Sequence, residues 1–467
     1  MSHSHDAFES FAATLEGALP SARSALYDGL IGSQTQIEGP FGPRPLIYAD
    51  YVASGRALRQ VETFVMEEVL PFYANTHTKA SYCGARMTEL REGARTKIGQ
   101  LCGANKDEHA VIFSGSGATQ GINQLLHLWK VGVGDTVLVG PYEHHSNLLP
   151  WRESGALVVE IPEGKEAGPD IDALRSEIKK FTQRGRVFVA MSAAANVTGV
   201  TSNVAEVTRV AKEGGAQILW DYAGGGPYLK MSMQPELDAQ VDAIVFSAHK
   251  FVGGPAASGV LIVRRDSVRC DVPYRPGGGT VAFVNAHRHD YVAGLEQREE
   301  GGTPNVIGDI RAALALIVKE VIGQDYLNMR NAELTAKAFA AWSNNKHVKL
   351  LAADRPERLP ILSFVPLDDT GNRIDHNAFT TALSERYGIQ ARGGCSCAGP
   401  YVHHLLAIAD ADSRRIRDNI VLGDSSEKPG FVRLNLSVLM DEETVEYILT
   451  AVAELAENWG RLDEAAA

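Results

Sequence analysis

The chain has 467 residues, of which 45% are hydrophobic and 22% are charged. This composition is typical of globular proteins, and the length fits two or three domains. Lys and Arg number 45 against 57 Asp and Glu, which gives a formal net charge of −12. No basic run indicates a nucleic-acid-binding surface, so a nucleic-acid partner is not expected.

The cysteines and the N-terminal sequence indicate a cytoplasmic protein. Five cysteines are few and odd in number, which argues against a disulfide framework and for a reducing compartment. The opening run MSHSHDAFES lacks the pattern of a signal peptide. No stretch approaches the roughly 18 apolar residues of a membrane span, so no membrane association is expected.

The first 306 residues predict an N-terminal helical segment followed by a large α/β domain. Helices are predicted at 7–16 and 22–30, in a segment (1–45) expected to pack with a smaller C-terminal domain. Short apolar strands then alternate with helical patterns, which is typical of a mostly parallel sheet. The predicted strands are 109–113, 136–139, 156–161, 186–191, 217–221, 243–246 and 259–263, with helices at 119–128, 170–181 and 204–213. Ligands of such sheets bind at the carboxyl ends of the strands.

The pattern changes from about residue 307. Long helices are predicted at 308–322 and 326–343, and weaker strands and a terminal helix at 347–352, 360–365, 431–436 and 442–458. The sequence therefore predicts a large domain over 46–306 and a smaller α+β domain over 307–467.

Two ionisable residues end predicted strands of the large domain. Asp221 follows isoleucine, leucine and tryptophan, and such a desolvated carboxylate needs a cation or strong donors. Lys250 follows the strand 243–246 and is bordered by small residues. Most lysines are solvated surface groups, but a lysine that forms a Schiff base lies in such a setting. A partner arginine or a helix cap is the alternative explanation for Asp221.

Other strand ends carry small and polar residues. The run 114–119, Ser-Gly-Ser-Gly-Ala-Thr, opens a helix and favours an anion, although an ordinary glycine turn with a threonine cap is the alternative. His144, His145 and Asn196 follow two further strands and are uninformative singly. Pyridoxal 5′-phosphate explains the whole series, because it needs a lysine, an acid for its pyridine nitrogen, a flat group over the ring and a cradle for phosphate.

At this level of detail the chain resembles the class V aminotransferase family of fold-type I pyridoxal-phosphate enzymes, on the cysteine desulfurase and selenocysteine lyase branch. The matching segments are Tyr48 to Ser54, Asn75-Thr76-His77, Ser116 to Thr119, Glu143-His144-His145, Asn196, Asp221, Ser247-Ala248-His249-Lys250 and Gly301 to Asn305. The resemblance implies a homodimer with the site at the subunit interface. It also implies that Thr280, in a glycine loop, reaches the phosphate of the other subunit.

The resemblance assigns roles to the matched residues. Cofactor binding falls to Ala118, Thr119, His144, Asn196, Asp221, Ser247, His249, Lys250 and Thr280. Among them, His144 stacks on the ring and Lys250 carries the Schiff base. Arg433 resembles the arginine that binds the substrate α-carboxylate, and Arg392 assists it. A structural salt bridge is the alternative for Arg433.

The run 392–400, Arg-Gly-Gly-Cys-Ser-Cys-Ala-Gly-Pro, decides which reaction is expected. Cys397 matches the catalytic cysteine of desulfurases, whose thiolate accepts sulfur as a persulfide. The alternatives are that Cys395 and Cys397 are small packing residues, or that they bind metal with His403 and His404; no metal site is predicted.

Three departures from the desulfurase pattern bear on this prediction. Gly224 stands where the family commonly has glutamine. Cys395 stands where many members carry histidine, and the resulting Gly-Cys-x-Cys pattern resembles the pyridoxal-phosphate domain of molybdenum cofactor sulfurases. A polar insertion at 410–419 lengthens the stretch before Arg433.

The sequence-based hypothesis is an enzyme that removes sulfur or selenium from L-cysteine or selenocysteine, giving alanine and a Cys397 persulfide. A small amino acid is the expected substrate, and a protein is a candidate sulfur acceptor. The alternatives are another class V reaction, such as transamination, β-elimination or epimerisation, and a non-enzymatic sulfur carrier or binding subunit.

Overall fold

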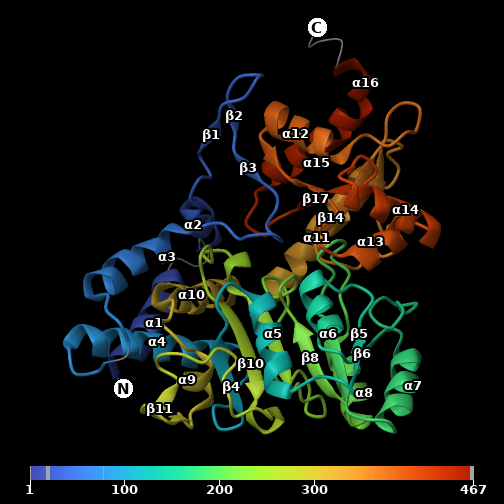
Figure 1. Cartoon of the computed structure of the whole chain (residues 1–467). Helices are drawn as coiled ribbons and strands as arrows, with labels where there is room; N and C mark the ends of the chain where they lie inside the picture. The colour runs from blue at the N-terminus through green and yellow to red at the C-terminus, as the bar shows by residue number, and fades with distance from the viewer. Residues whose placement is uncertain (1, 17–21, 77, 463–467) are drawn as a thin grey trace.

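The computed structural model describes residues 2–16, 22–76 and 78–462, and a seven-stranded and a four-stranded sheet organise this part of the chain (Figure 1). At the N-terminus, α1 (Ser2–Glu16) packs against α4 (Tyr82–Leu101) and α10 (Val306–Ile322). Strand β2 (Arg44–Pro45) contacts α12 (His376–Tyr387), farther along the chain. The N-terminal residues therefore touch both the early and the late parts of the fold.

The large sheet confirms the predicted mainly parallel α/β architecture. Its strands, in spatial order, are β4 (His109–Phe113), β10 (Gly259–Arg264), β9 (Ala243–Ser247), β8 (Gln217–Asp221), β7 (Val187–Ser192), β5 (Thr136–Val139) and β6 (Leu157–Glu160). The strands from β9 to β6 pair in parallel, and β10 runs antiparallel to both of its neighbours. All seven predicted strands are present, with ends that differ by at most one residue.

Helices cover both faces of this sheet because its strands are apolar on both sides. Helix α5 (Ala118–Trp129) contacts β9 and β10, and it shares a core with α6 (Leu149–Glu153). On the other face, α7 (Ile171–Thr182) and α8 (Val204–Glu213) pack on β5, β7 and β8. Strand β9 shows the alternation, because Val245 belongs to the first core and Phe246 to the second.

The second sheet is smaller and antiparallel, as the predicted α+β domain requires. Its order is β13 (Val348–Leu350), β14 (Ile361–Pro366), β17 (Phe431–Asn435) and β16 (Arg392–Gly394). Around it lie α11 (Gln324–Trp342), α12, α13 (Gly399–Leu405), α14 (Asp410–Val421) and α15 (Glu442–Glu457) (Figure 1). A short parallel pair, β3 (Ile47–Tyr48) with β15 (Ile389–Gln390), ties residues 47–48 to this region. The domain limits 1–45, 46–306 and 307–467 remain predictions.

Short elements complete the described chain. They are α2 (Ala22–Gly29), β1 (Gln36–Ile37), α3 (Arg59–Phe64), η1 (Val65–Val69), η2 (Leu70–Phe72), η3 (His145–Asn147), η4 (Ala248–Lys250), η5 (Arg265–Ser267), β11 (Val281–Val284), β12 (His289–Tyr291), α9 (Leu295–Glu299) and α16 (Trp459–Leu462). The predicted glycine loop at 276–280 leads into the antiparallel pair β11–β12. Within the described residues, no helix has the length and apolarity needed to cross a membrane.

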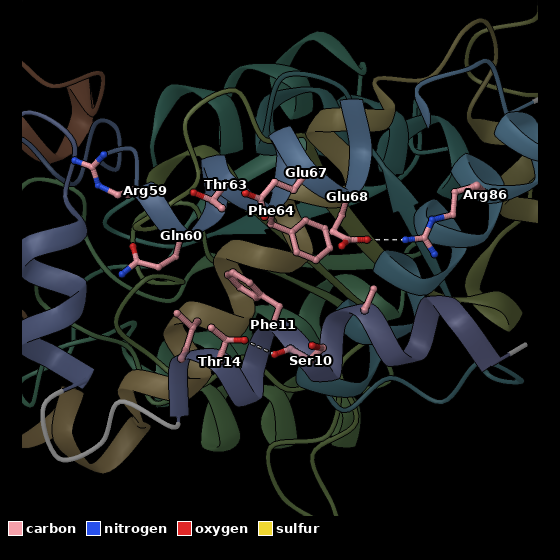
Figure 2. A pocket seen from close by; sticks show the side chains of 12 residues that line it. Ser10, Phe11, Thr14, Arg59, Gln60, Thr63, Phe64, Glu67, Glu68 and Arg86 are labelled. Carbon is pink, nitrogen blue, oxygen red and sulfur yellow. Dashed lines mark hydrogen bonds and ion pairs between the residues drawn. The ribbon is translucent and has the colours of Figure 1, made fainter. Parts of the chain in front are cut away.

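One cavity lies between α1 and the segment formed by α3 and η1 (Figure 2). Phe11 and Phe64 line it and meet edge to face, with ring centroids 5.5 Å apart. Glu68 pairs with Arg86 at 2.8 Å beside them. None of the sequence-predicted site residues lines this cavity, so its chemistry is separate from that of the strand ends.

Candidate functional site

A second cavity, of about 260 Å³, lies at the carboxyl ends of the parallel strands. Eleven of the twelve residues predicted from the sequence line it: Ala118, Thr119, His144, Asn196, Asp221, Ser247, His249, Lys250, Arg392, Cys397 and Arg433. They come from the start of α5, from the ends of β5, β7, β8 and β9, and from the second sheet and the turn after β16. The fold therefore brings together residues that are spread over more than 300 positions of sequence.

Two ionisable residues at strand ends, Lys250 and Asp221, line the cavity. Asp221 is buried at the end of β8, where its Oδ1 accepts a hydrogen bond from the Ala223 N–H at 2.7 Å. Burial raises the pKa of Asp221, and the Lys250 ammonium opposes that rise. Burial lowers the pKa of Lys250 to about 8, against the opposing effect of Asp221. The amine is therefore closer to its neutral, nucleophilic form than an exposed lysine would be.

Small residues form a close cradle at the start of α5. Gly117 has φ of 140°, and a Cβ there would lie 2.9 Å from Ser247 Oγ and 3.1 Å from His249 Cε1. The Ala118 N–H donates to Ser247 Oγ at 3.0 Å. The Thr119 and Ser146 hydroxyls lie 2.7 Å apart. Hydroxyl groups and a helix N-terminus thus meet in one place, which suits a phosphate group.

His144 follows β5 and is held by a buried network. Its Nδ1 accepts a hydrogen bond from the Ser146 N–H at 3.1 Å, so the neutral ring carries its proton on Nε2. Burial and then the Lys250 charge lower the pKa of His144 to about 4, which keeps the ring uncharged. The preceding residue, Glu143, is buried and accepts from Asn147 Nδ2 and from the N–H and hydroxyl of Ser192.

Two arginines that line the cavity share one carboxylate. Arg433 Nη2 donates to Asp50 Oδ1 at 2.8 Å, and Arg392 Nε donates to Asp50 Oδ2 at 2.9 Å. Arg433 is buried, and within the described residues its Nε has no hydrogen-bond partner. Because two guanidinium groups share one carboxylate, the cluster has a net positive charge and can bind one more carboxylate.

Cys397 lies in a turn between β16 and α13 and is exposed at the cavity. Ser396 and Cys397 have φ of 50° and 55°, a left-handed conformation that is uncommon outside glycine. Asn196 Nδ2 donates to the Ser396 carbonyl at 2.7 Å, and Asn196 Oδ1 is buried without a partner in the described structure. Cys395 instead packs against the apolar cluster around Tyr401 and Phe431. The two cysteines therefore have different surroundings.

Some predicted residues lie elsewhere. Thr280 is outside the cavity, and its hydroxyl donates to the Gly277 carbonyl at 2.7 Å, so its role toward a second subunit remains a prediction. His77 lies outside the described residues.

Gly224 lines the cavity, and a Cβ there would lie 3.2 Å from the Ala194 carbonyl oxygen. Among the described residues, no group of three or more His, Cys, Asp or Glu is arranged to hold a metal ion.

Comparison with known proteins places this geometry in a family. The model of the class-V aminotransferase family matches residues 47–448. The chain belongs to the class-V aminotransferase family. It is 30% identical over 364 residues to a cysteine desulfurase of Enterobacter sp. (strain 638), which covers 76% of this chain and 85% of that protein. It is also 30% identical over 352 residues, 73% of this chain and 83% of the relative, to the cysteine desulfurase CsdA of Escherichia coli K12.

Solved structures confirm the fold. The apo cysteine desulfurase of Thermococcus onnurineus NA1 superposes with a TM-score of 0.72 and 23% identity, covering 88% of this chain and 94% of that one. The Escherichia coli CsdA structure gives a TM-score of 0.69 and 23% identity, with coverage of 95% and 98%. The chain is thus a cysteine-desulfurase-like member of the class-V family, and this membership implies pyridoxal 5′-phosphate as the cofactor.

The residues present fit the cofactor that the family implies. The Gly117 cradle has no room for a side chain, and Ser247 and His249 border it. The buried Asp221 carboxylate suits a pyridinium nitrogen. Asn196 lines the same cavity, and its buried Oδ1, which has no hydrogen-bond partner among the described residues, can accept a hydrogen bond from the cofactor. Lys250 would hold the cofactor covalently, Thr119 and Ser247 would bind its phosphate, and His144 would cover its ring.

Sequence reasoning missed four residues of this site. Asp50, which joins the two arginines, lies only two residues after β3 and was recognised only as part of a family segment. Ser146, Ser192 and Ser396 line the cavity as well. The position of Ser192 could have indicated its role in the site, because Ser192 ends β7 at the same edge of the sheet as Asp221 and Ser247. Serine is too common in turns for that signal to be specific.

Replacing Asp50 tests how far the two arginines depend on it. Asp50→Asn leaves the buried Arg433 guanidinium without its counter-charge, so we expect the free energy of unfolding to fall by about 3 kcal/mol. The matched control is Asp238→Asn, which removes an exposed partner of Arg209 and should cost less than about 1 kcal/mol. Chemical denaturation of both variants measures the difference. Equal losses would show that Arg433 does not need Asp50.

The lowered pKa of Lys250 predicts a pH-dependent effect on stability. In the protein without cofactor, the folded state binds fewer protons at Lys250 than the unfolded state between about pH 8 and 10.5. Stability therefore rises with pH through this window, and Lys250→Met removes the rise. We expect Lys250→Met to raise the melting temperature by about 1–3 °C at pH 7.5 and by less at pH 10. A gain that grows with pH would contradict the assignment.

Proposed function

We propose that this protein is a pyridoxal-phosphate enzyme that removes sulfur from L-cysteine, or selenium from L-selenocysteine, and produces alanine through a persulfide, or the corresponding selenenyl sulfide, on Cys397. The observation that carries the proposal is that the exposed Cys397 lines the same cavity as Lys250 and Asp221. Both relatives named above are called cysteine desulfurases, at 30% identity, which supports the same reaction class.

The arginines and the lysine would bind and activate the amino acid. Arg433, which lines the cavity, and the exposed part of Arg392 would bind the α-carboxylate, while Asp50 holds both guanidinium groups in place. Lys250 Nζ, with its pKa lowered to about 8, would take the α-proton as a base. When bound, pyridoxal 5′-phosphate supplies an electron sink for bonds broken at the α-carbon.

Cys397 would then accept the sulfur. A bond forms between Cys397 Sγ and the substrate sulfur as the substrate C–S bond breaks, and its electron pair remains with the carbon. That carbon gains a proton, so L-cysteine and the Cys397 thiol give alanine and the Cys397 persulfide. A thiol or an acceptor protein then removes the outer sulfur and restores Cys397. We also propose that the enzyme is a homodimer in which Thr280 faces the partner's cofactor phosphate.

Product analysis tests the reaction class. Cofactor-loaded enzyme is incubated with L-cysteine and dithiothreitol, and alanine, pyruvate and sulfide are measured. The proposal predicts one alanine for each sulfide and no pyruvate. Pyruvate in place of alanine would indicate β-elimination, and an amino group passed to an added keto acid would indicate transamination. Either result would overturn the proposed reaction.

A further inference from the structure

Residues 395–399 are here called the Cys397 turn. They contact His145, which directly follows His144, the residue proposed to stack on the cofactor ring. The His145 main-chain N–H donates to the Cys397 carbonyl at 2.8 Å. The Gly399 N–H donates to His145 Nε2 at 3.0 Å. One residue therefore binds the turn on both sides of Ala398, although it lies about 250 positions earlier in the sequence.

The conformation of the Cys397 turn needs such support. Ser396 and Cys397 are successive non-glycine residues in the left-handed region, and each is expected to cost of order 1 kcal/mol relative to a relaxed conformation. The loop after β7 adds another side-chain contact, the hydrogen bond from Asn196 Nδ2 to the Ser396 carbonyl. Contacts from the end of β5 and from the loop after β7 thus compensate the strain of the turn.

The hydrogen bond from Gly399 determines the protonation state of the His145 ring. Because Gly399 is a donor, Nε2 must be unprotonated, and the neutral ring carries its proton on Nδ1. Burial and then the Arg152 charge lower the pKa of His145, which favours the neutral ring. The His144 ring, 6.1 Å away between centroids, has its own pKa lowered to about 4 and adds no charge near neutral pH.

We infer that His145 is a positioning residue that holds the Cys397 turn against the His144 segment, so that the Cys397 thiol faces the substrate sulfur. The inference rests on the proposed function for the meaning of Cys397, but not for the contact itself. His145 is not among the residues that line the strand-end cavity. Its loss should therefore affect the sulfur-transfer step and leave cofactor and amino-acid binding intact.

The test compares His145→Phe, which removes the acceptor, with His145→Gln, whose amide oxygen can accept from Gly399. His404→Phe is the matched control, because His404 is an exposed histidine on α13. Hydrogen–deuterium exchange of the peptide 395–405 in cofactor-loaded enzyme measures the turn directly. Single-turnover formation of the Cys397 persulfide from L-cysteine measures its effect on the reaction.

We expect His145→Phe to accelerate exchange of the peptide and to slow persulfide formation, each by about tenfold. A change of this size corresponds to the free energy of roughly one hydrogen bond. The cofactor spectral change on adding L-cysteine should persist, and His145→Gln should restore both rates to within about threefold. If His145→Phe does not fold, His145→Asn replaces it, because its side chain is too short to reach Gly399.

Rates in His145→Phe equal to those of wild type and His404→Phe would overturn the inference, as would failure of His145→Gln to restore them. If the wild-type enzyme forms no persulfide, the proposed function fails instead. The exchange comparison still decides the role of His145 in that case, because it does not depend on turnover.

Discussion

Lys250→Ala is expected to abolish the visible absorbance of the cofactor-loaded protein and all activity toward amino acids. The reason is chemical, because alanine has no amine to hold the cofactor covalently or to move the α-proton. We expect activity to fall by at least about 10³-fold, as for loss of a group that acts as both covalent anchor and base. Absorbance spectra after reconstitution and removal of free cofactor provide the measurement.

Lys319→Met is the matched control for this variant. Lys319 is also buried deeply enough to lower the pKa of its amine to about 8, but it donates to the Gly226 and Leu229 carbonyls. It lies outside the strand-end cavity, so its loss should lower thermal stability and leave the cofactor absorbance in place. Retention of the absorbance in Lys250→Ala would contradict the assignment of the anchoring lysine.

Cys397→Ala is expected to lower sulfide release from L-cysteine by at least about 100-fold while the protein keeps its cofactor absorbance. Alanine has no thiolate to attack the substrate sulfur, whereas Lys250, Asp221 and Arg433 remain in place. Sulfide is measured under reductant, with the amount of bound cofactor determined for each preparation.

Cys395→Ala provides the control, because Cys395 packs against apolar side chains near Tyr401 and Cys397 is exposed. Its sulfide release should stay within about threefold of wild type, since only packing changes. Equal, large losses in both variants would indicate that the region has a structural role. Full activity in Cys397→Ala would exclude the persulfide step.

The sequence predicted the large sheet well because its strands are apolar on both faces and end in polar residues. That pattern is local, so the strand ends at Asp221 and Ser247 could be identified before their neighbours in space were known. Helix α4 was not identified, although Met87, Leu90, Ala94 and Ile98 repeat at helical spacing. Its mixed composition, with arginines on the buried side, obscured the repeat; Arg91 pairs with Asp309 and Glu300.

The contacts within the site could not be predicted from the sequence. Asp50 reaches Arg433 across 383 positions, and His145 reaches Gly399 across 254. Such pairs depend on how the second sheet sits over the first, which no local pattern encodes. Family resemblance supplied the residues of the site, and the structure added the connections among them.

The most direct test of the central claim is the mass of the Cys397 peptide after a single turnover. Cofactor-loaded enzyme is mixed with less than one equivalent of L-cysteine without reductant, alkylated and digested. The account predicts one additional sulfur atom on the peptide that contains Cys397 and an equal amount of alanine. Alanine or another product without sulfur on Cys397, or sulfur on Cys395 alone, would contradict it.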